Sequence, residues 1–154
     1  MAKKTTNANK VSKSLSDELA VLLSDTFVLA LKTQNYHWNI RGPNFYALHK
    51  MFEEQYDALY EASDLLAERI RALGSVAPGG LADFSKITNI LDAKKNASSS
   101  EMLSDLAKSH ESIVKLANSV IKVAEKLGDQ ATVDIIVTRI EDHDKVIWML
   151  KSSL

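Results

Sequence analysis

The sequence predicts an all-α protein, a bundle of four long helices with one long crossover in the middle of the chain. Only five Gly and two Pro occur among 154 residues, too few for the many turns of an all-β fold. Apolar residues recur at the three- and four-residue spacing of a helix face through most of the chain. The two clear breaks are Gly42-Pro43 and Pro78-Gly79-Gly80.

Composition limits the possible function classes. The chain is 45% hydrophobic and 25% charged, as in a soluble globular domain of ordinary size. It has no cysteine, which excludes disulfides, thiolate catalysis and zinc ribbons. The N-terminal residues lack the apolar run of a secretory signal, and no segment approaches the roughly 18 apolar residues of a membrane span. We expect a cytoplasmic protein with no membrane partner.

Residues 1–13 are expected to form a flexible basic tail in front of a bundle domain spanning residues 14–154. Four lysines precede the first acidic residue, Asp17: Lys3, Lys4, Lys10 and Lys13. Subtracting these 4 from 19 basic residues leaves 15 against 20 acidic ones, so the rest of the chain carries a charge of −5. A basic arm on an acidic body either contacts polyanions or serves only to keep the protein soluble.

The first two helices flank the Gly42-Pro43 break. The first is predicted from Ser14 to about Ile40, with Ser14 and Asp17 as its capping pair. Proline disfavours helical geometry at the preceding residue, so this helix ends at the break. The second is predicted over residues 44–73, with Gly74 as its C-terminal stop.

Residues 75–100 form the crossover, which contains a short helix predicted over residues 81–91. A connection of this length can join two parallel helices of a bundle. The third helix is predicted over residues 99–127, because Ser98 and Glu101 form a capping-box pattern. The fourth is predicted over residues 129–151. The order describes a ferritin-like four-helix bundle with a short extra helix between the second and third helices.

Five side chains around the first break are candidate metal ligands: His37, His49, Glu53, Asp64 and Glu68. Imidazole and carboxylate groups suit iron or zinc. Residues four apart share a helix face, which pairs His49 with Glu53 and Asp64 with Glu68. His49 and Asp64 lie about 22 Å apart along one helix, whereas metal–ligand bonds measure about 2.0–2.2 Å. One helix therefore cannot hold both pairs on one metal.

Two arrangements solve this problem. Each pair can find partners within its own bundle, or two copies of the helix can pack antiparallel about a two-fold axis and create two sites at once. An intrachain di-iron centre needs Glu-x-x-His motifs, which this chain lacks, so the intersubunit arrangement is favoured. His110 and His143 are interpreted as surface or packing residues. Chance pairing remains an alternative, in which Glu68 pairs with Arg69 or Arg71.

Residues 35–74 closely resemble the signature of the Dps family, the mini-ferritins that protect DNA during starvation. The matching features are His37-Trp38-Asn39, Gly42-Pro43, Phe45, Leu48-His49 and the stretch from Asp64 to Arg69. The four helices, the crossover helix and the polar N-terminal tail agree along nearly the whole chain.

The resemblance implies a hollow dodecamer that oxidises Fe(II), preferably with hydrogen peroxide, and stores Fe(III) inside. It implies a ferroxidase centre between two-fold-related subunits, with His37, His49 and Glu53 from one subunit and Asp64 and Glu68 from the other. Many members have Asp where this chain has Glu53, so the longer side chain loosens or shifts the second iron position.

Further roles follow from the same resemblance. Trp38 and Tyr36 either intercept oxidising equivalents or pack at the interface. Asp129 and Asp134 resemble acids that line iron-entry pores; the alternatives are a helix cap for Asp129 and a solvated face for Asp134. Non-specific DNA binding through the four tail lysines would place the protein at the nucleoid. The competing functions are a nucleoid-binding structural protein with a secondary metal site and a plain helical oligomerisation module.

Overall fold

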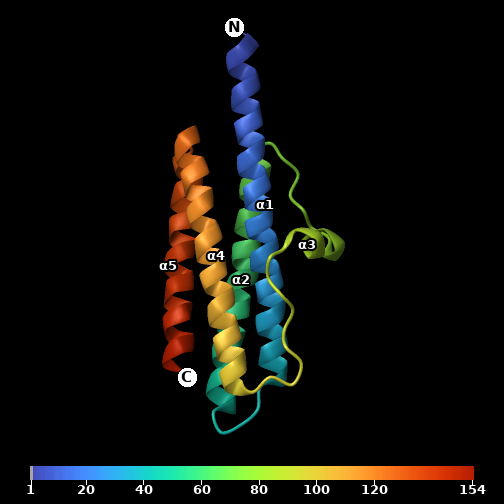
Figure 1. The fold of residues 1–154 in the computed structure, drawn as a ribbon, viewed down its shortest axis with the longest axis vertical. Helices are drawn as coiled ribbons and strands as arrows, with labels where there is room; N and C mark the ends of the chain where they lie inside the picture. Colours follow the sequence, from blue (N-terminus) through green and yellow to red (C-terminus); the bar gives the residue numbers. More distant parts are fainter. Residues whose placement is uncertain (1) are drawn as a thin grey trace.

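The computed structural model describes the backbone of residues 2–154 and the side chains of residues 15–154. The helices of this range are α1 (Ala2–Asn39), α2 (Phe45–Ala72), α3 (Leu81–Ile87), α4 (Ser99–Leu127) and α5 (Gln130–Ser152), and it contains no strand. The pairs α1–α2 and α4–α5 are antiparallel hairpins, and α3 lies outside the bundle beside α1 (Figure 1). The predicted all-α bundle with a helix in its crossover is confirmed.

Helix α1 begins at Ala2 rather than at Ser14, and its N-terminal end extends beyond the other helices (Figure 1). Residues 2–13 contain neither Gly nor Pro, so no local signal forces the helix to start at the Ser14 capping pair. The side chains of residues 1–14 lie outside the described part of the chain. The flexibility of the tail and the DNA contacts of Lys3, Lys4, Lys10 and Lys13 therefore stay predictions.

The other helix ends follow local signals in the sequence. Gly74, two residues after the end of α2, and Gly128, directly after α4, take positive φ values of 87° and 67°, the conformation that favours glycine. Ser98 and Glu101 form the predicted capping box at the start of α4. Helix α3 ends at Ile87 instead of Leu91, because Thr88 adopts extended backbone geometry and its hydroxyl donates to Asp25 at 2.8 Å.

The crossover is held against the outer face of α1. Buried Asp25 also accepts a hydrogen bond from the backbone N–H of Asn89 at 2.6 Å. Phe84 of α3 stacks on Phe27 of α1 with ring centroids 4.6 Å apart. Apolar side chains from α1, α2, α4 and α5 fill the interior of the bundle, including Leu19, Leu22, Phe52, Leu66, Leu106, Ile113 and Ile136. No helix in the described part of the chain is both long and apolar enough to cross a membrane.

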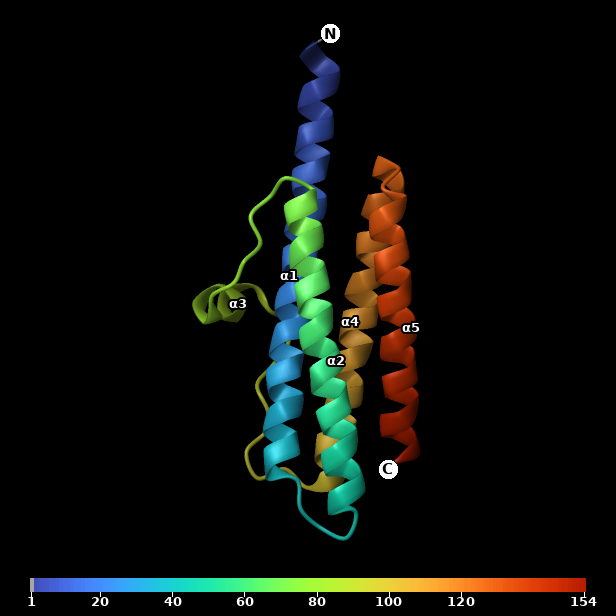
Figure 2. The ribbon, with the colours of Figure 1, turned by 180° about the vertical axis from the view of Figure 1, so that it is seen from behind.

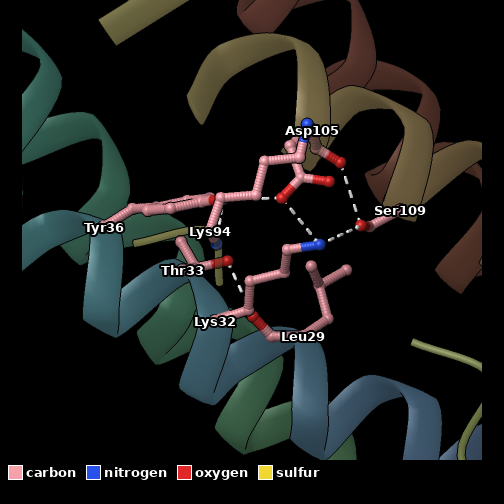
Figure 3. A network of polar contacts seen from close by, with 7 residues as sticks. All are labelled: Leu29, Lys32, Thr33, Tyr36, Lys94, Asp105 and Ser109. Atoms are coloured by element: carbon pink, nitrogen blue, oxygen red, sulfur yellow. Dashed lines mark hydrogen bonds and ion pairs between the residues drawn. The ribbon is translucent and has the colours of Figure 1, made fainter. Parts of the chain in front are cut away.

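A polar network is buried between α1 and α4 (Figure 3). The Lys32 side chain is only 2% exposed, and its ammonium lies 2.8 Å from the Asp105 carboxylate and donates to the Ser109 hydroxyl at 3.1 Å. The Tyr36 hydroxyl donates to Asp105 at 2.6 Å and accepts the backbone N–H of Lys94 at 2.9 Å. Burial, reinforced by the bond to Asp105, raises the pKa of Tyr36, so the phenol stays protonated as a donor. The network thereby joins α1, α4 and the end of the crossover.

Candidate metal centre

His37 and His49 meet at the α1–α2 turn. Gly42 makes this turn possible with a φ of 118°, in the region that side-chain-bearing residues rarely adopt. The two imidazole rings stack with centroids 3.8 Å apart and planes 17° from parallel. Phe45 stacks on the outer side of His49 at 5.0 Å, and Tyr56 packs edge-on against His37 at 5.2 Å. The aromatic neighbours restrict the orientation of both imidazoles.

Reciprocal hydrogen bonds fix the tautomers of these histidines. The Nδ1 atom of His37 lies 2.8 Å from the backbone carbonyl oxygen of His49, and Nδ1 of His49 lies 2.9 Å from the carbonyl oxygen of His37. A carbonyl oxygen can only accept, so each Nδ1 carries its proton and donates. Each neutral ring then keeps the lone pair on Nε2, the atom available to a metal ion. Backbone carbonyls thus provide the orienting bonds that metal-binding histidines require.

Glu53 lies one turn after His49 and adds a carboxylate to this pair. It is partly exposed and accepts a hydrogen bond from the Lys50 ammonium at 2.6 Å. This bond, together with the positive charge of Lys50, lowers the pKa of Glu53, although burial partly opposes the shift. The carboxylate is therefore ionised and within electrostatic reach of both imidazoles. The Lys50 ammonium contacts only one of its two oxygens, Oε2.

Asp64 and Glu68 are exposed on α2, far from the histidines of the same chain. They follow His49 by 15 and 19 residues, or about 22–28 Å along a helix. Among the side chains of residues 15–154, no three His, Asp or Glu residues form a group that could hold a metal ion. Arg69 pairs with Asp129, and Arg71 donates to the carbonyl of Ser75. The alternative in which these arginines neutralise Glu68 is therefore not seen in the described part of the chain.

Tyr36 and Trp38 differ sharply in environment. Tyr36 is fully buried in the polar network, whereas Trp38 is 66% exposed. Trp38 borders a cleft of 980 Å³ between the end of α1 and the crossover. Leu31, Leu81 and Leu91 also line this cleft and are exposed. An apolar surface of this kind, beside the candidate ligand His37, is suited to contact another protein surface.

Asp129 acts as the N-cap of α5, as the capping alternative predicted. Its side chain accepts the backbone N–H of Thr132 at 3.1 Å, and the Arg69 guanidinium donates to its two oxygens at 2.7 and 2.8 Å. Burial raises the pKa of Asp129, but the bonds from Arg69 and Thr132 outweigh it and lower the pKa overall. Asp134 is exposed and accepts from Gln130 at 2.7 Å. A pore-lining role for both acids stays a prediction.

His110 of α4 and His143 of α5 form a buried pair that sequence reasoning did not find. Each is 1% exposed, and their Nδ1 atoms lie 2.7 Å apart. The surface alternative for these residues is wrong, and the packing alternative is right. The sequence did contain a signal that His110 is buried. His110 lies at helical spacing from Leu103, Leu106 and Ile113, on the face of α4 that packs into the core.

The His110–His143 pair predicts a loss of stability in acid. Burial, with a contribution from Arg139, lowers the pKa of His110 to about 3 and that of His143 well below its usual value. The unfolded chain binds protons on both rings below pH 6.5, so stability falls as the pH drops from about 6.5 towards 3. At pH 5 this amounts to roughly 2–4 kcal/mol for the pair. Thermal unfolding at pH 7.5 and pH 5 measures the effect.

The control is the double variant His110→Leu/His143→Met, which removes both titrating groups. Its Tm should change much less between pH 7.5 and pH 5 than the Tm of the unaltered protein. An equal fall in Tm for both proteins would show that other groups cause the acid sensitivity.

Comparisons with known proteins identify the family of this chain. Residues 16–154 match the model of the Ferritin-like domain family. The chain is 33% identical to the DNA protection during starvation protein of Brevibacillus brevis over 145 residues, which cover 92% of this chain and 97% of that protein.

Two solved structures share the fold closely. Dps from Staphylococcus aureus superposes with a TM-score of 0.90 at 32% identity, covering 92% of this chain and 95% of that one. The Dps protein from Vibrio cholerae O1, described as a member of a broad superfamily of ferritin-like diiron-carboxylate proteins, gives a TM-score of 0.89 at 28% identity, covering 93% and 90%. The chain therefore belongs to the Dps family of ferritin-like proteins.

Proposed function

We propose that this protein is a ferroxidase and iron store that oxidises Fe(II) with hydrogen peroxide at centres shared between two subunits. The reciprocal hydrogen bonds of His37 and His49 carry this proposal, because they leave one imidazole nitrogen on each ring for a metal ion. In the proposed centre His37, His49 and Glu53 of one subunit face Asp64 and Glu68 of its two-fold mate. We propose iron as the metal because the similar structure from Vibrio cholerae is described as a ferritin-like diiron-carboxylate protein.

The chemistry limits the release of radicals. Two Fe(II) ions supply the two electrons that reduce one hydrogen peroxide, and two protons complete the formation of two water molecules. Paired oxidation avoids the one-electron cleavage that releases hydroxyl radical. The protein contributes ionised carboxylates, which favour Fe(III), and imidazoles in a fixed orientation. Trp38 and Tyr36, next to His37 in the chain, are proposed to intercept stray oxidising equivalents. DNA is protected because iron and peroxide are consumed together.

The assembly we propose is a dodecameric cage built from two-fold dimers. The exposed apolar side chains near Trp38 support a dimer contact beside the metal centre. Asp64 and Glu68, which have no metal-binding partners within their own described chain, support a contribution to a neighbouring subunit. Asp129 and Asp134 are proposed to line the pores by which Fe(II) enters, and Fe(III) accumulates in the interior.

Mixing two inactive variants tests the shared centre. One variant carries His37→Ala and His49→Ala, and the other carries Asp64→Asn and Glu68→Gln. In a mixed dimer the intact histidines of one subunit face the intact carboxylates of the other, so one of the two centres is restored. We expect co-assembled protein to regain peroxide-dependent Fe(II) oxidation, measured by the absorbance of the Fe(III) product.

Each variant assembled alone is the control, and both should be inactive at an unchanged oligomeric mass. A mixed assembly as inactive as its parents would contradict the shared centre, because intrachain sites cannot be rescued by mixing. A monomeric mass of the unaltered protein would contradict the cage as well.

DNA binding through the N-terminal segment is the second proposed activity, and the Brevibacillus brevis relative is named a DNA protection during starvation protein. Twelve copies of a segment with four lysines would combine weak phosphate contacts, independent of base sequence. This activity would place the protein in the cytoplasm at the nucleoid.

Deletion of residues 1–13 should abolish the shift of duplex DNA in a gel at low salt. Replacement of the four lysines by glutamine should have the same effect, and undiminished binding would exclude the segment as the DNA contact.

A further inference from the structure

An exposed stripe of basic and hydroxyl side chains runs along α4. Residues seven apart on a helix lie only about 20° from each other around its axis, so they share one face. Between residues 108 and 126, the side chains within about 40° of Lys108 around the axis are all exposed lysines and serines. We call this set the α4 lysine stripe: Lys108, Ser112, Lys115, Ser119, Lys122 and Lys126. Its four lysines span about 27 Å of the helix.

The lysines of the stripe are not neutralised by nearby carboxylates. None of the four forms an ion pair with the described side chains of residues 15–154. Glu111, at the edge of the stripe, is paired instead with Lys151 of α5 at 2.6 Å. On the α1 side, Glu18 accepts a hydrogen bond from the Ser119 hydroxyl at 3.4 Å. Together with Lys151 the stripe has five lysines against Glu18, Glu111 and Glu125, so this face has a net charge of +2.

The face of the bundle that α2 forms has the opposite charge. Helices α2 and α4 lie diagonally across the bundle, because each of them packs on α1 and α5. Helix α4 is in front in Figure 1, and α2 is in front in Figure 2. The exposed charged side chains of α2 are two basic groups, Lys50 and Arg71, and five carboxylates: Glu54, Asp57, Glu61, Asp64 and Glu68. A polyanion is therefore repelled from the α2 face and attracted to the α4 face.

The stripe leads towards the N-terminal segment of the chain. The bond between Ser119 and Glu18 places the C-terminal half of α4 beside the first described side chains of α1. The N-terminal part of α1 extends beyond the bundle at the end where α4 finishes (Figure 1). Residues 1–13, which contain four lysines, therefore continue from the end of the stripe. A long polyanion that binds this segment is brought alongside α4.

We propose that the α4 lysine stripe is a docking surface for the backbone of duplex DNA, a proposal that rests on the DNA binding proposed for the N-terminal segment. Duplex DNA has a persistence length of about 50 nm, so it is straight over the length of the stripe and reaches all four lysines without bending. The hydroxyls of Ser112 and Ser119 are further donors for phosphate oxygens.

Two features define how the stripe binds. Helix α4 has no Phe, Tyr or Trp on which the bases of a single strand could stack, so the stripe favours a duplex. Four lysines beside three carboxylates are too few to hold DNA alone. The stripe therefore strengthens a complex that the N-terminal segment begins, through contacts that do not depend on base sequence.

Fluorescence anisotropy of a short labelled duplex, titrated with the full-length assembly at several salt concentrations, tests the stripe. Lys115→Gln/Lys122→Gln removes two of its charges. Each lost phosphate contact lowers the slope of log K against log salt by about 0.9, so we expect a slope smaller by about 1.8 and an affinity about 10-fold weaker or more at low salt. Lys86→Gln/Lys145→Gln is the matched control, because it removes two exposed charges from α3 and α5. It should bind DNA like the unaltered protein.

The outcomes separate the stripe from the N-terminal segment. Equal slopes and affinities in the two double variants would overturn the stripe and leave the proposed role of the segment intact. No DNA binding by the unaltered protein at low salt would overturn both. A single strand bound as tightly as a duplex of the same length would overturn the assignment to duplex DNA. Glu125→Gln removes a carboxylate beside the stripe and should tighten binding, and unchanged affinity would also contradict the proposal. Fe(II) oxidation should be the same in all these variants.

Discussion

Replacement of both His37 and His49 by alanine is expected to slow peroxide-dependent Fe(II) oxidation by about 100-fold or more. Loss of a residue that merely orients a metal ligand typically costs 10–100-fold, so removal of two ligands should cost at least the upper value. The two rings are the only nitrogen ligands of the proposed centre. Stopped-flow absorbance of Fe(III) formation at saturating peroxide measures the rate.

Asn39→Ala is the matched control, because Asn39 is an exposed neighbour of His37 on α1 that bonds only to Asn35 within the described side chains. It should retain the Fe(II) oxidation rate of the unaltered protein. Size-exclusion chromatography with light scattering checks that the histidine variant keeps its assembly. Unchanged oxidation kinetics in an intact assembly of that variant would exclude His37 and His49 as ligands.

Asp105→Ala is expected to lower the free energy of unfolding by about 3–5 kcal/mol, since it leaves the buried Lys32 ammonium without its partner. The same change removes the acceptor of the Tyr36 hydroxyl and loosens the attachment of Lys94 in the crossover. The variant should therefore unfold at a clearly lower temperature or denaturant concentration. Urea unfolding followed by circular dichroism measures the loss.

Two comparisons separate the buried charge from other effects. The double variant Lys32→Met/Asp105→Leu removes both charges, so it should lose much less stability than Asp105→Ala. Glu111→Gln breaks the exposed pair between Glu111 and Lys151, which should change stability by at most about 1 kcal/mol. If the double variant is as unstable as Asp105→Ala, an unpaired lysine charge is not the cause.

Local signals account for the part of the fold that could be predicted. Ser98 with Glu101 marks the start of α4, and Gly74 and Gly128 mark helix ends, because each acts within one turn of the chain. The predicted start of α1 was wrong because the capping signal is also only local. Ser14 and Asp17 permit a helix to start there, but no residue before them prevents a longer helix.

The candidate metal centre was only partly accessible from the sequence. Helix geometry placed Asp64 and Glu68 out of reach of His49 in one chain, and among the described side chains no three possible ligands come together. The orientation of the histidines could not be predicted, because it depends on backbone carbonyls across the α1–α2 turn. Which residues of the two subunits form the shared centre stays a prediction, and co-assembly of the two inactive variants tests it.

By itself the sequence determined the four long helices, the break at Gly42-Pro43 and the crossover, since periodicity, caps and turn residues are local properties. The tertiary structure decided which polar groups meet: Lys32 with Asp105, His110 with His143, and the imidazole nitrogens of His37 and His49 with each other's carbonyls. Such contacts join residues far apart in the chain. They depend on the rotation of each helix about its axis, which only the packing of the whole bundle fixes.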